Sequence, residues 1–281
     1  MMIIWLASYP KSGNTWVRSI ISSLLFTEDG DFNFNLIKNI KQYPTKDQFK
    51  QFTTNFEDIN EIKKYWVLTQ EKINLDNQIK FLKTHHLNCK IGDYNFTNKG
   101  NTLATIYIVR DPRNLISSIS NHFDYSLEES KNFILSQKVI GGNKVLGNLN
   151  KNYLPTILGS WKEHYKFWKN KNENYLLIKY ENLINQPEIE LEKIISFLKK
   201  YIPIKTNEEK NKKILETTSF EKLKNLEIEG KFNENAYQSP GKKITFFHLG
   251  PKNNWKKLLD NKIIKELELN LKNEMKELDY L

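Results

Sequence analysis

Short apolar segments alternate with amphipathic ones along this chain, and that alternation restricts the folds open to it. Four segments are apolar, rich in β-branched or aromatic residues, and followed by a turn or helix signal: residues 3–8, 81–84, 104–109 and 175–178. Such segments are typical of buried strands. Apolar residues recur at helical spacing over residues 14–26 and 187–200 and over roughly the last 20 residues. We therefore expect an α/β fold in three layers, with helices on both faces of a central parallel sheet.

The length suits one large α/β domain or two small ones, and we expect a single domain over residues 1–281, in a reducing compartment. Hydrophobic residues make up 39% of the chain, enough for a sizeable core, and the single cysteine, Cys89, excludes an internal disulfide. No basic region precedes the short apolar start, so we expect no signal peptide. No stretch approaches the roughly 18 uninterrupted apolar residues of a membrane span. We predict a cytoplasmic protein without a membrane span.

The formal net charge of +10 is spread along the chain and interleaved with Asn and Glu. This spread argues against a face dedicated to nucleic acid, so no nucleic-acid partner is expected. An excess of positive charge still favours the approach of an anionic nucleotide. The oligomeric state stays open.

The sharpest local pattern is YPKSGNTW at residues 9–16, between the first expected strand and an amphipathic helix. The free N–H groups and the dipole at such a helix start favour an anion, so we expect a P-loop-like phosphate-binding loop. Gly13 permits a tight turn, and Lys11 supplies a mobile positive charge. The spacing is not the GxxxxGK[ST] of a Walker A loop. An ordinary helix start capped by Ser12 or Asn14 is the alternative.

The octapeptide resembles the 5′-phosphosulfate loop of sulfotransferases that use 3′-phosphoadenosine 5′-phosphosulfate (PAPS), with Asn14 where that family usually has Thr. Five further segments resemble the same family in the same order: residues 83–85 (KTH), 106–114 (IYIVRDPRN), 178–183 (IKYENL), 218–220 (TSF) and 250–256 (GPKNNWK). These matches run from residue 9 to residue 256 and fall at strand and helix boundaries. The chain thus resembles the cytosolic-type sulfotransferases over nearly its whole length.

The resemblance implies transfer of a sulfuryl group from PAPS to a hydroxyl or amine, with adenosine 3′,5′-bisphosphate (PAP) as product and no metal. It makes His85 the catalytic base and places Lys11 and Lys83 near the transferring group. The cofactor-binding residues that it implies are Lys11, Ser12, Gly13, Asn14, Thr15, Trp16, Arg110, Ser118, Tyr180, Thr218, Phe220, His248 and Gly250.

Arg110 and His85 also have physical reasons for these roles. PAPS carries a 3′-phosphate that ATP lacks, and the planar guanidinium of Arg110 suits it. An ion pair with Asp111 is the alternative for Arg110. An unperturbed imidazole pKa of about 6.5 suits proton abstraction by His85 at neutral pH, but the adjacent His86 makes the pair ambiguous. No metal-ligand spacing surrounds the pair, so we expect no metal there.

Two other implied residues have structural alternatives. Trp16 fits the buried face of its helix as well as an adenine stack. Ser117 and Ser120 are chemically similar to Ser118, so spacing alone does not select among the three.

The chain departs from the family at the segment that contacts the 3′-phosphate. His248 and Leu249 stand where the family has Arg and Lys, and only Gly250 matches. Two fixed charges are missing, which leaves His248 and Lys252 as the candidates to replace them. A preference for a different nucleotide stays open.

Two other classes of protein remain as alternatives. A P-loop nucleotide kinase or other NTP-binding enzyme shares the strand–loop–helix arrangement, but the Walker A spacing is missing. A non-catalytic module could keep the fold and bind anions, but Lys11, Lys83 and His85 are all present.

The acceptor is not readable from the sequence, and a small molecule, a saccharide and a lipid are all open. Residues 27–75 and 124–155 are the segments that we expect to cover an acceptor pocket. The aromatic residues that could line it, or belong to the core, are Tyr125, Phe133, Tyr153, Trp161, Tyr165, Phe167 and Trp168.

Overall fold

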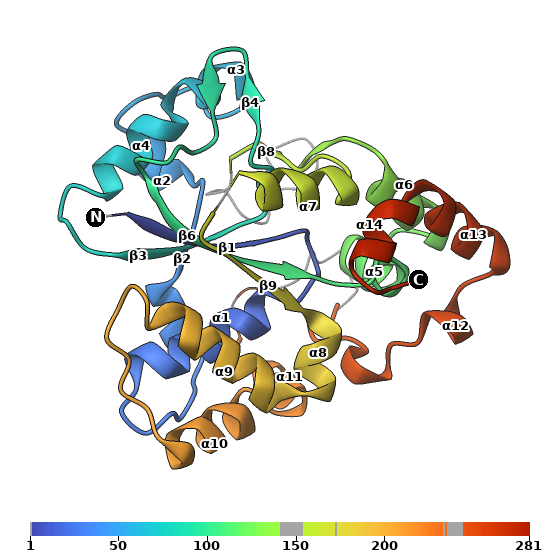
Figure 1. Ribbon diagram of the computed structural model, residues 1–281. Coiled ribbons are helices and arrows are strands. Elements are labelled where there is room, and N and C mark those ends of the chain that lie inside the picture. Colours follow the sequence, from blue (N-terminus) through green and yellow to red (C-terminus); the bar gives the residue numbers. More distant parts are fainter. Residues whose placement is uncertain (1, 141–153, 172, 233, 235–243) are drawn as a thin grey trace. The chain divides into compact units, whose positions relative to one another are not determined.

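A five-stranded sheet is the main feature of the computed structural model, which describes residues 2–140, 154–171, 173–232, 234 and 244–281 (Figure 1). The strands lie in the order β2-β3-β1-β6-β9. Their bounds are β1 Ile3–Ser8, β2 Lys41–Gln42, β3 Lys80–Thr84, β6 Thr102–Val109 and β9 Tyr175–Lys179. β3 pairs in parallel with both β1 and β2. Every residue of β1 is buried, which explains why this strand reads as an uninterrupted apolar run.

The chain forms two compact units, each assembled from separate segments of the sequence. Unit 1 comprises Met1–Tyr9, Lys41–Tyr107 and Asn132–Tyr175, and unit 2 comprises Pro10–Ile40, Ile108–Lys131 and Leu176–Leu281. The chain passes from one unit to the other after Tyr9 and after Ile40, and again within β6, helix α6 (Leu127–Leu135) and β9. The single domain expected from the sequence stays a prediction.

Unit 1 is built around aromatic side chains. Trp5 of β1 lies 5.5 Å from Tyr43, 5.6 Å from Phe96 and 6.0 Å from Trp168, measured between ring centroids. The helices of this unit are α2 Lys46–Phe49, α3 Ile59–Ile62, η2 Lys63–Tyr65, α4 Trp66–Ile73 and α7 Trp161–Asn170. Two small antiparallel sheets add β4 Lys90–Ile91 with β5 Tyr94–Asn95, and β7 Val139–Ile140 with β8 Thr156–Ile157. Large rings that contact each other at these distances give this unit a dense apolar core.

Unit 2 contains most of the helices. They are α1 Asn14–Phe26, η1 Leu36–Asn39, α5 Pro112–Phe123, α8 Tyr180–Asn185, α9 Pro187–Leu198, α10 Glu208–Thr217, α11 Phe220–Ile228, η3 Gly250–Lys252, α12 Trp255–Leu258, α13 Asn261–Asn270 and α14 Lys272–Glu277. Asp111 caps α5 by accepting a hydrogen bond from the Arg113 N–H, and Pro112 occupies its first turn. This start fixes the direction in which the chain leaves β6.

The predicted α/β fold with a parallel sheet is confirmed, and all four predicted strands are present. Helix α1 has the predicted bounds, whereas the final helical stretch is interrupted between α13 and α14 at Leu271. Neither β2 nor the two small antiparallel sheets could be predicted, because two-residue strands are too short to show a period. No helix among the described residues is long and apolar enough to cross a membrane.

Candidate active site

The loop after β1 is shaped by two residues in left-handed backbone conformations. Lys11 has φ of 67° and Gly13 has φ of 102°. A Cβ atom on Gly13 would lie 2.6 Å from Cδ2 of Tyr180, so this position excludes a side chain for two reasons. Gly13 is the N-cap of α1 and no side chain caps that helix, so the alternative cap by Ser12 or Asn14 is not observed. Uncapped N–H groups at the start of a helix favour an anion.

Arg110, directly after β6, faces this loop. Its Nη1 donates a hydrogen bond to the Lys11 carbonyl oxygen at 3.2 Å, and its guanidinium carbon lies 4.1 Å from the centroid of the Tyr180 ring. The Tyr180 ring in turn meets the Trp16 ring edge-on at 5.6 Å. These contacts bring together four residues that the sequence predicted to bind one cofactor.

Two polar atoms at this position have unmet hydrogen-bonding capacity. The Ser12 Oγ and the Arg110 Nε are buried, and neither has a hydrogen-bond partner within the described residues. Buried polar groups are normally paired, so these atoms fit the negatively charged oxygens of a phosphate or sulfate group. The alternative ion pair of Arg110 with Asp111 is wrong, since Asp111 pairs with Arg113 at 2.7 Å instead.

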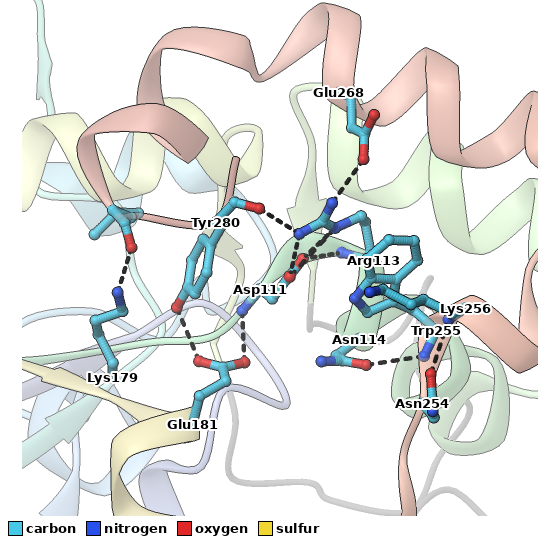
Figure 2. Close-up of polar contacts among 11 residues, drawn as sticks. Asp111, Arg113, Asn114, Lys179, Glu181, Asn254, Trp255, Lys256, Glu268 and Tyr280 are labelled. Carbon is cyan, nitrogen blue, oxygen red and sulfur yellow. Dashed lines mark hydrogen bonds and ion pairs between the residues drawn. The ribbon is translucent and has the colours of Figure 1, made fainter.

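A charged network supports the backbone beside Arg110 and Tyr180 (Figure 2). The Asp111 N–H donates to Oε1 of Glu181 at 3.0 Å, and the Tyr280 hydroxyl donates to Oε2 of the same carboxylate at 2.9 Å. Burial raises the pKa of Glu181. Arg113 binds Asp111, Glu268 at 2.6 Å and the Tyr280 carbonyl oxygen at 2.6 Å. Each carboxylate in this network therefore has a donor or a positive charge beside it.

The segment 250–256 contacts the start of α5. Asn253 donates through Nδ2 to the Asn114 carbonyl oxygen at 2.7 Å, and the Trp255 N–H donates to Oδ1 of Asn114 at 3.3 Å. The Arg113 guanidinium stacks on the Trp255 ring at 4.0 Å (Figure 2). Two motifs that are more than a hundred residues apart in the sequence are thus neighbours within unit 2.

His248 lies near two lysines. Burial, followed by the charges of Lys224 and Lys11, lowers the pKa of His248 below its ordinary value. Lys224 also donates to the His248 carbonyl oxygen at 2.9 Å, and the Lys11 ammonium lies 3.7 Å from the centroid of the Phe246 ring. Burial and the two lysine charges therefore disfavour the charged form of this histidine.

The remaining predicted cofactor residues also belong to unit 2. Gly250 has φ of +53°, and a Cβ there would lie 2.3 Å from the Phe220 ring. The buried Thr218 hydroxyl donates to the Ile214 carbonyl oxygen at 2.7 Å. Ser118 is half-buried, whereas the hydroxyls of its two similar neighbours donate to Asn253 and to the Tyr125 carbonyl oxygen.

The two histidines after β3 have different surroundings in unit 1. The Nδ1 of His85 lies 2.7 Å from the Ser8 carbonyl oxygen, which can only accept a hydrogen bond. In the neutral ring the proton therefore sits on Nδ1, and the lone pair belongs to Nε2. His86 stacks on Phe96 at 4.2 Å, and burial lowers the pKa of His86 to about 3. Lys83, the other predicted catalytic residue of this segment, is only 8% exposed.

Most of the aromatic residues proposed for an acceptor pocket are buried in unit 1. Trp161, Tyr165 and Trp168 are no more than 2% exposed, so they belong to the core. Phe167 is 39% exposed. Tyr153 and residues 141–153 of the proposed acceptor cover lie outside the described residues.

Sequence reasoning missed the residues that support the site. Glu181 and Asp111 lay inside recognised motifs, but nothing in the sequence indicated that one accepts a hydrogen bond from the other. Arg113 lies in a recognised motif that implied no role for it, and Tyr280 lies in a segment that matches no motif. Long-range contacts of this kind leave no local pattern.

Comparisons with known proteins agree with the geometry. The model of the family "Sulfotransferase domain" matches residues 3–279. The 3-alpha-hydroxysteroid sulfotransferase of Cavia porcellus is 25% identical over 254 residues, covering 89% of this chain and 75% of the relative. The flavonol 3-sulfotransferase of Flaveria bidentis is 24% identical over 278 residues, covering 94% and 79%.

Two solved structures share the fold. Mouse sulfotransferase SULT7A1, complexed with PAP, has a TM-score of 0.58 and 20% identity, with 99% of this chain and 85% of that chain covered. Retinol dehydratase in a complex with retinol and PAP has a TM-score of 0.61 and 18% identity, with 98% and 81% covered. With the family match spanning almost its entire length, this chain belongs to the sulfotransferase domain family.

Proposed function

We propose that this sulfotransferase moves a sulfuryl group from PAPS to a hydroxyl or amine of a small-molecule, saccharide or lipid acceptor. The observation that carries the proposal is the meeting of Lys11, Gly13, Arg110 and Tyr180 around buried donors without partners in the described part of the chain. A guanidinium that forms no ion pair with a carboxylate in the described part of the chain suits the 3′-phosphate. The resemblance to the family assigns Trp16 and Tyr180 to contacts with adenine. Solved structures that share the fold contain PAP, which agrees with this choice of nucleotide.

The reaction that we propose is a direct in-line displacement. The acceptor oxygen or nitrogen forms a bond to sulfur while the bond from sulfur to the bridging 5′-phosphate oxygen breaks, and PAP leaves with that electron pair. Lys11, the N–H groups at the start of α1, and Lys83 stabilise the charge that develops on the bridging and sulfuryl oxygens. The resemblance to the family assigns Lys83 and His85 of unit 1 to this reaction.

His85 takes the acceptor proton in this proposal. The carbonyl of Ser8 keeps the Nδ1 position protonated, so Nε2 is the basic atom of the neutral ring. The deeply buried neighbour, His86, is a poor alternative because its pKa of about 3 leaves it a very weak base. No group of three or more His, Cys, Asp or Glu side chains within the described ranges is arranged to hold a metal.

A nucleotide-binding experiment tests the proposal before the acceptor is known. PAP without Mg²⁺ should raise the melting temperature and should do so more than ATP with Mg²⁺. A larger shift with ATP and Mg²⁺ would instead favour a P-loop kinase. Transfer of ³⁵S from PAPS to a panel of phenols, sterols, saccharides and lipids then identifies the acceptor class. Binding of PAP with no transfer to any of them would favour a non-catalytic module.

The cytoplasmic location of this protein stays a prediction. The comparisons include cytosolic sulfotransferase 12 of Arabidopsis thaliana, which is 26% identical over 193 residues. Cell fractionation tests this prediction: the native protein should be recovered in the cytosolic fraction.

A further inference from the structure

Helix α7 is tied to the segment that follows β3 by two buried side chains. Nε2 of His164 lies 3.1 Å from the His85 carbonyl oxygen, and Nε1 of Trp168 donates to the His86 carbonyl oxygen at 2.9 Å. His164 and Trp168 are four residues apart and therefore share one face of the helix. Both are fully buried. Two successive carbonyl groups of the His–His pair are thus held by one helix face within unit 1.

The tautomer of His164 follows from its partners. A carbonyl oxygen only accepts, so Nε2 of His164 carries the proton that it donates to His85. Nδ1 then holds the lone pair and accepts from the Tyr107 hydroxyl, 2.8 Å away. Burial lowers the pKa of His164 to about 3, so the ring stays neutral near pH 7. The result is a directed chain of hydrogen bonds from Tyr107 through His164 to the backbone of His85.

His164 also contacts the other end of the predicted site within unit 1. Its ring meets the Tyr9 ring edge-on at 5.8 Å, and Tyr9 is the first residue of the phosphate-loop motif. The Tyr9 hydroxyl donates to the Phe133 carbonyl oxygen at 2.7 Å, which fixes that ring in turn. The neutral His164 ring therefore contacts both Tyr9, which follows β1, and His85, which follows β3.

We propose that His164 is a positioning residue for sulfuryl transfer, resting on the proposed role of His85 as the base. His164 holds the carbonyl of His85 while the Ser8 carbonyl holds Nδ1 of the same residue. Two fixed points on one residue restrict both its backbone and its ring. The ring then keeps its Nδ1–H tautomer and directs the Nε2 lone pair at the acceptor proton. His164 itself touches no reacting atom.

Histidine NMR tests the proposal without any acceptor. The chain has only five histidines, so a protein labelled with ¹⁵N-histidine gives few signals. In the wild type, His164 should show the Nε2–H tautomer and His85 the Nδ1–H tautomer. In His164→Leu, His85 should become a mixture of tautomers, and His164→Gln should restore the Nδ1–H form because its amide can both donate and accept. An Nδ1–H tautomer for His164 in the wild type would overturn the proposal, and this result needs no variant to fold.

Kinetics supply the second readout. His164→Leu should lower kcat about 10-fold while the Kd for PAP stays within about 2-fold, and His164→Gln should recover most of the rate. Trp168→Phe is the matched control, because it removes the neighbouring donor but leaves the carbonyl of His85 bonded. An equal loss of kcat in Trp168→Phe and His164→Leu would show a general packing effect and overturn the proposal. A wild type that binds no PAP and transfers no sulfuryl group would refute the proposed function instead. The NMR measurement would still show whether His164 fixes the tautomer of His85.

Discussion

Two groups of residues are held in place by opposite means. One is proposed for catalysis and belongs to unit 1, and the other is proposed to bind the nucleotide and belongs to unit 2. His85 is held by the neutral ring of His164 and by the Ser8 carbonyl group, whereas the backbone next to Arg110 and Tyr180 is held by ion pairs and a buried carboxylate. A base must stay uncharged until it takes a proton, so neutral supports suit it. A site for a multiply charged anion needs positive charge that nearby acids do not cancel. Asp111 forms its ion pair with Arg113, so it does not neutralise Arg110.

The two groups of residues should therefore respond to different perturbations. Loss of a neutral support should change the geometry of the base and its rate. Loss of a charged group that holds the nucleotide should change nucleotide affinity, whereas Lys11 is also proposed to stabilise the transferring group, so its loss should change the rate. The following five expectations test that division, from the largest expected effect to the smallest.

Acid should destabilise unit 1 through its two buried histidines. Burial lowers the pKa of both His86 and His164 to about 3, while the unfolded chain titrates near the ordinary value of about 6.5. The unfolded state therefore binds more protons between these values, so stability is present above about pH 6.5 and falls as the pH drops toward 3. We expect about 2 kcal/mol of loss for each histidine at pH 5, measured by urea unfolding. His164→Gln should halve the loss, and equal stability at pH 7 and pH 5 would contradict the burial of both rings.

Removal of the proposed base should affect rate alone. His85→Asn should reduce kcat by about 10²- to 10³-fold, the range expected for a general base, and leave the Kd for PAP within about 2-fold. The rate is measured with the acceptor found in the ³⁵S screen, and PAP binding by calorimetry. An unimpaired kcat would mean that another group accepts the proton.

Loss of the Lys11 ammonium should lower the rate of sulfuryl transfer. Lys11→Ala should reduce kcat by about 10²-fold, the scale of losing one donor that stabilises charge in the transition state. Lys224→Ala is a suitable control, because Lys224 also lies beside His248 but is not part of the loop. A near-normal kcat in Lys11→Ala would remove this residue from the mechanism.

Arg110 should determine nucleotide affinity. Arg110→Ala should weaken PAP binding by about 30-fold, equivalent to about 2 kcal/mol, because a charge-assisted contact is lost. Arg110→Lys should recover only part of this loss, since an ammonium lacks the planar fork. Calorimetry with PAP and with ATP checks the result, and the idea fails if both nucleotides lose affinity equally, because ATP has no 3′-phosphate.

Tyr280 should have the smallest effect, and on stability. Tyr280→Phe removes the hydrogen bond to Glu181, so we expect a loss of about 1–2 kcal/mol in the free energy of unfolding. Exposed Tyr94→Phe serves as a control that should change little. Unchanged stability in Tyr280→Phe would show that the Glu181 carboxyl finds another donor.

The fold could be predicted where the physical signal is local. A strand buried along its whole length, such as β1, reads as a short apolar run, and α1 reads as a helix because its apolar residues repeat at helical spacing. The phosphate loop was recognisable from its motif between an apolar strand and an amphipathic helix, and its Gly13 has the positive φ that favours glycine. The short edge strand β2 and the two small antiparallel sheets have no such local signal.

The class of fold, the family and the residue types offered to an anion and a proton can be read from the sequence alone. Three pairings required the folded chain: Asp111 pairs with Arg113 and not with Arg110, Ser8 holds His85 while His86 is buried, and His164 donates to His85. The reason is physical. Strand and helix patterns arise from contacts between residues close in the chain, whereas the partner of a buried polar group is chosen by whatever the fold brings within about 3 Å of it.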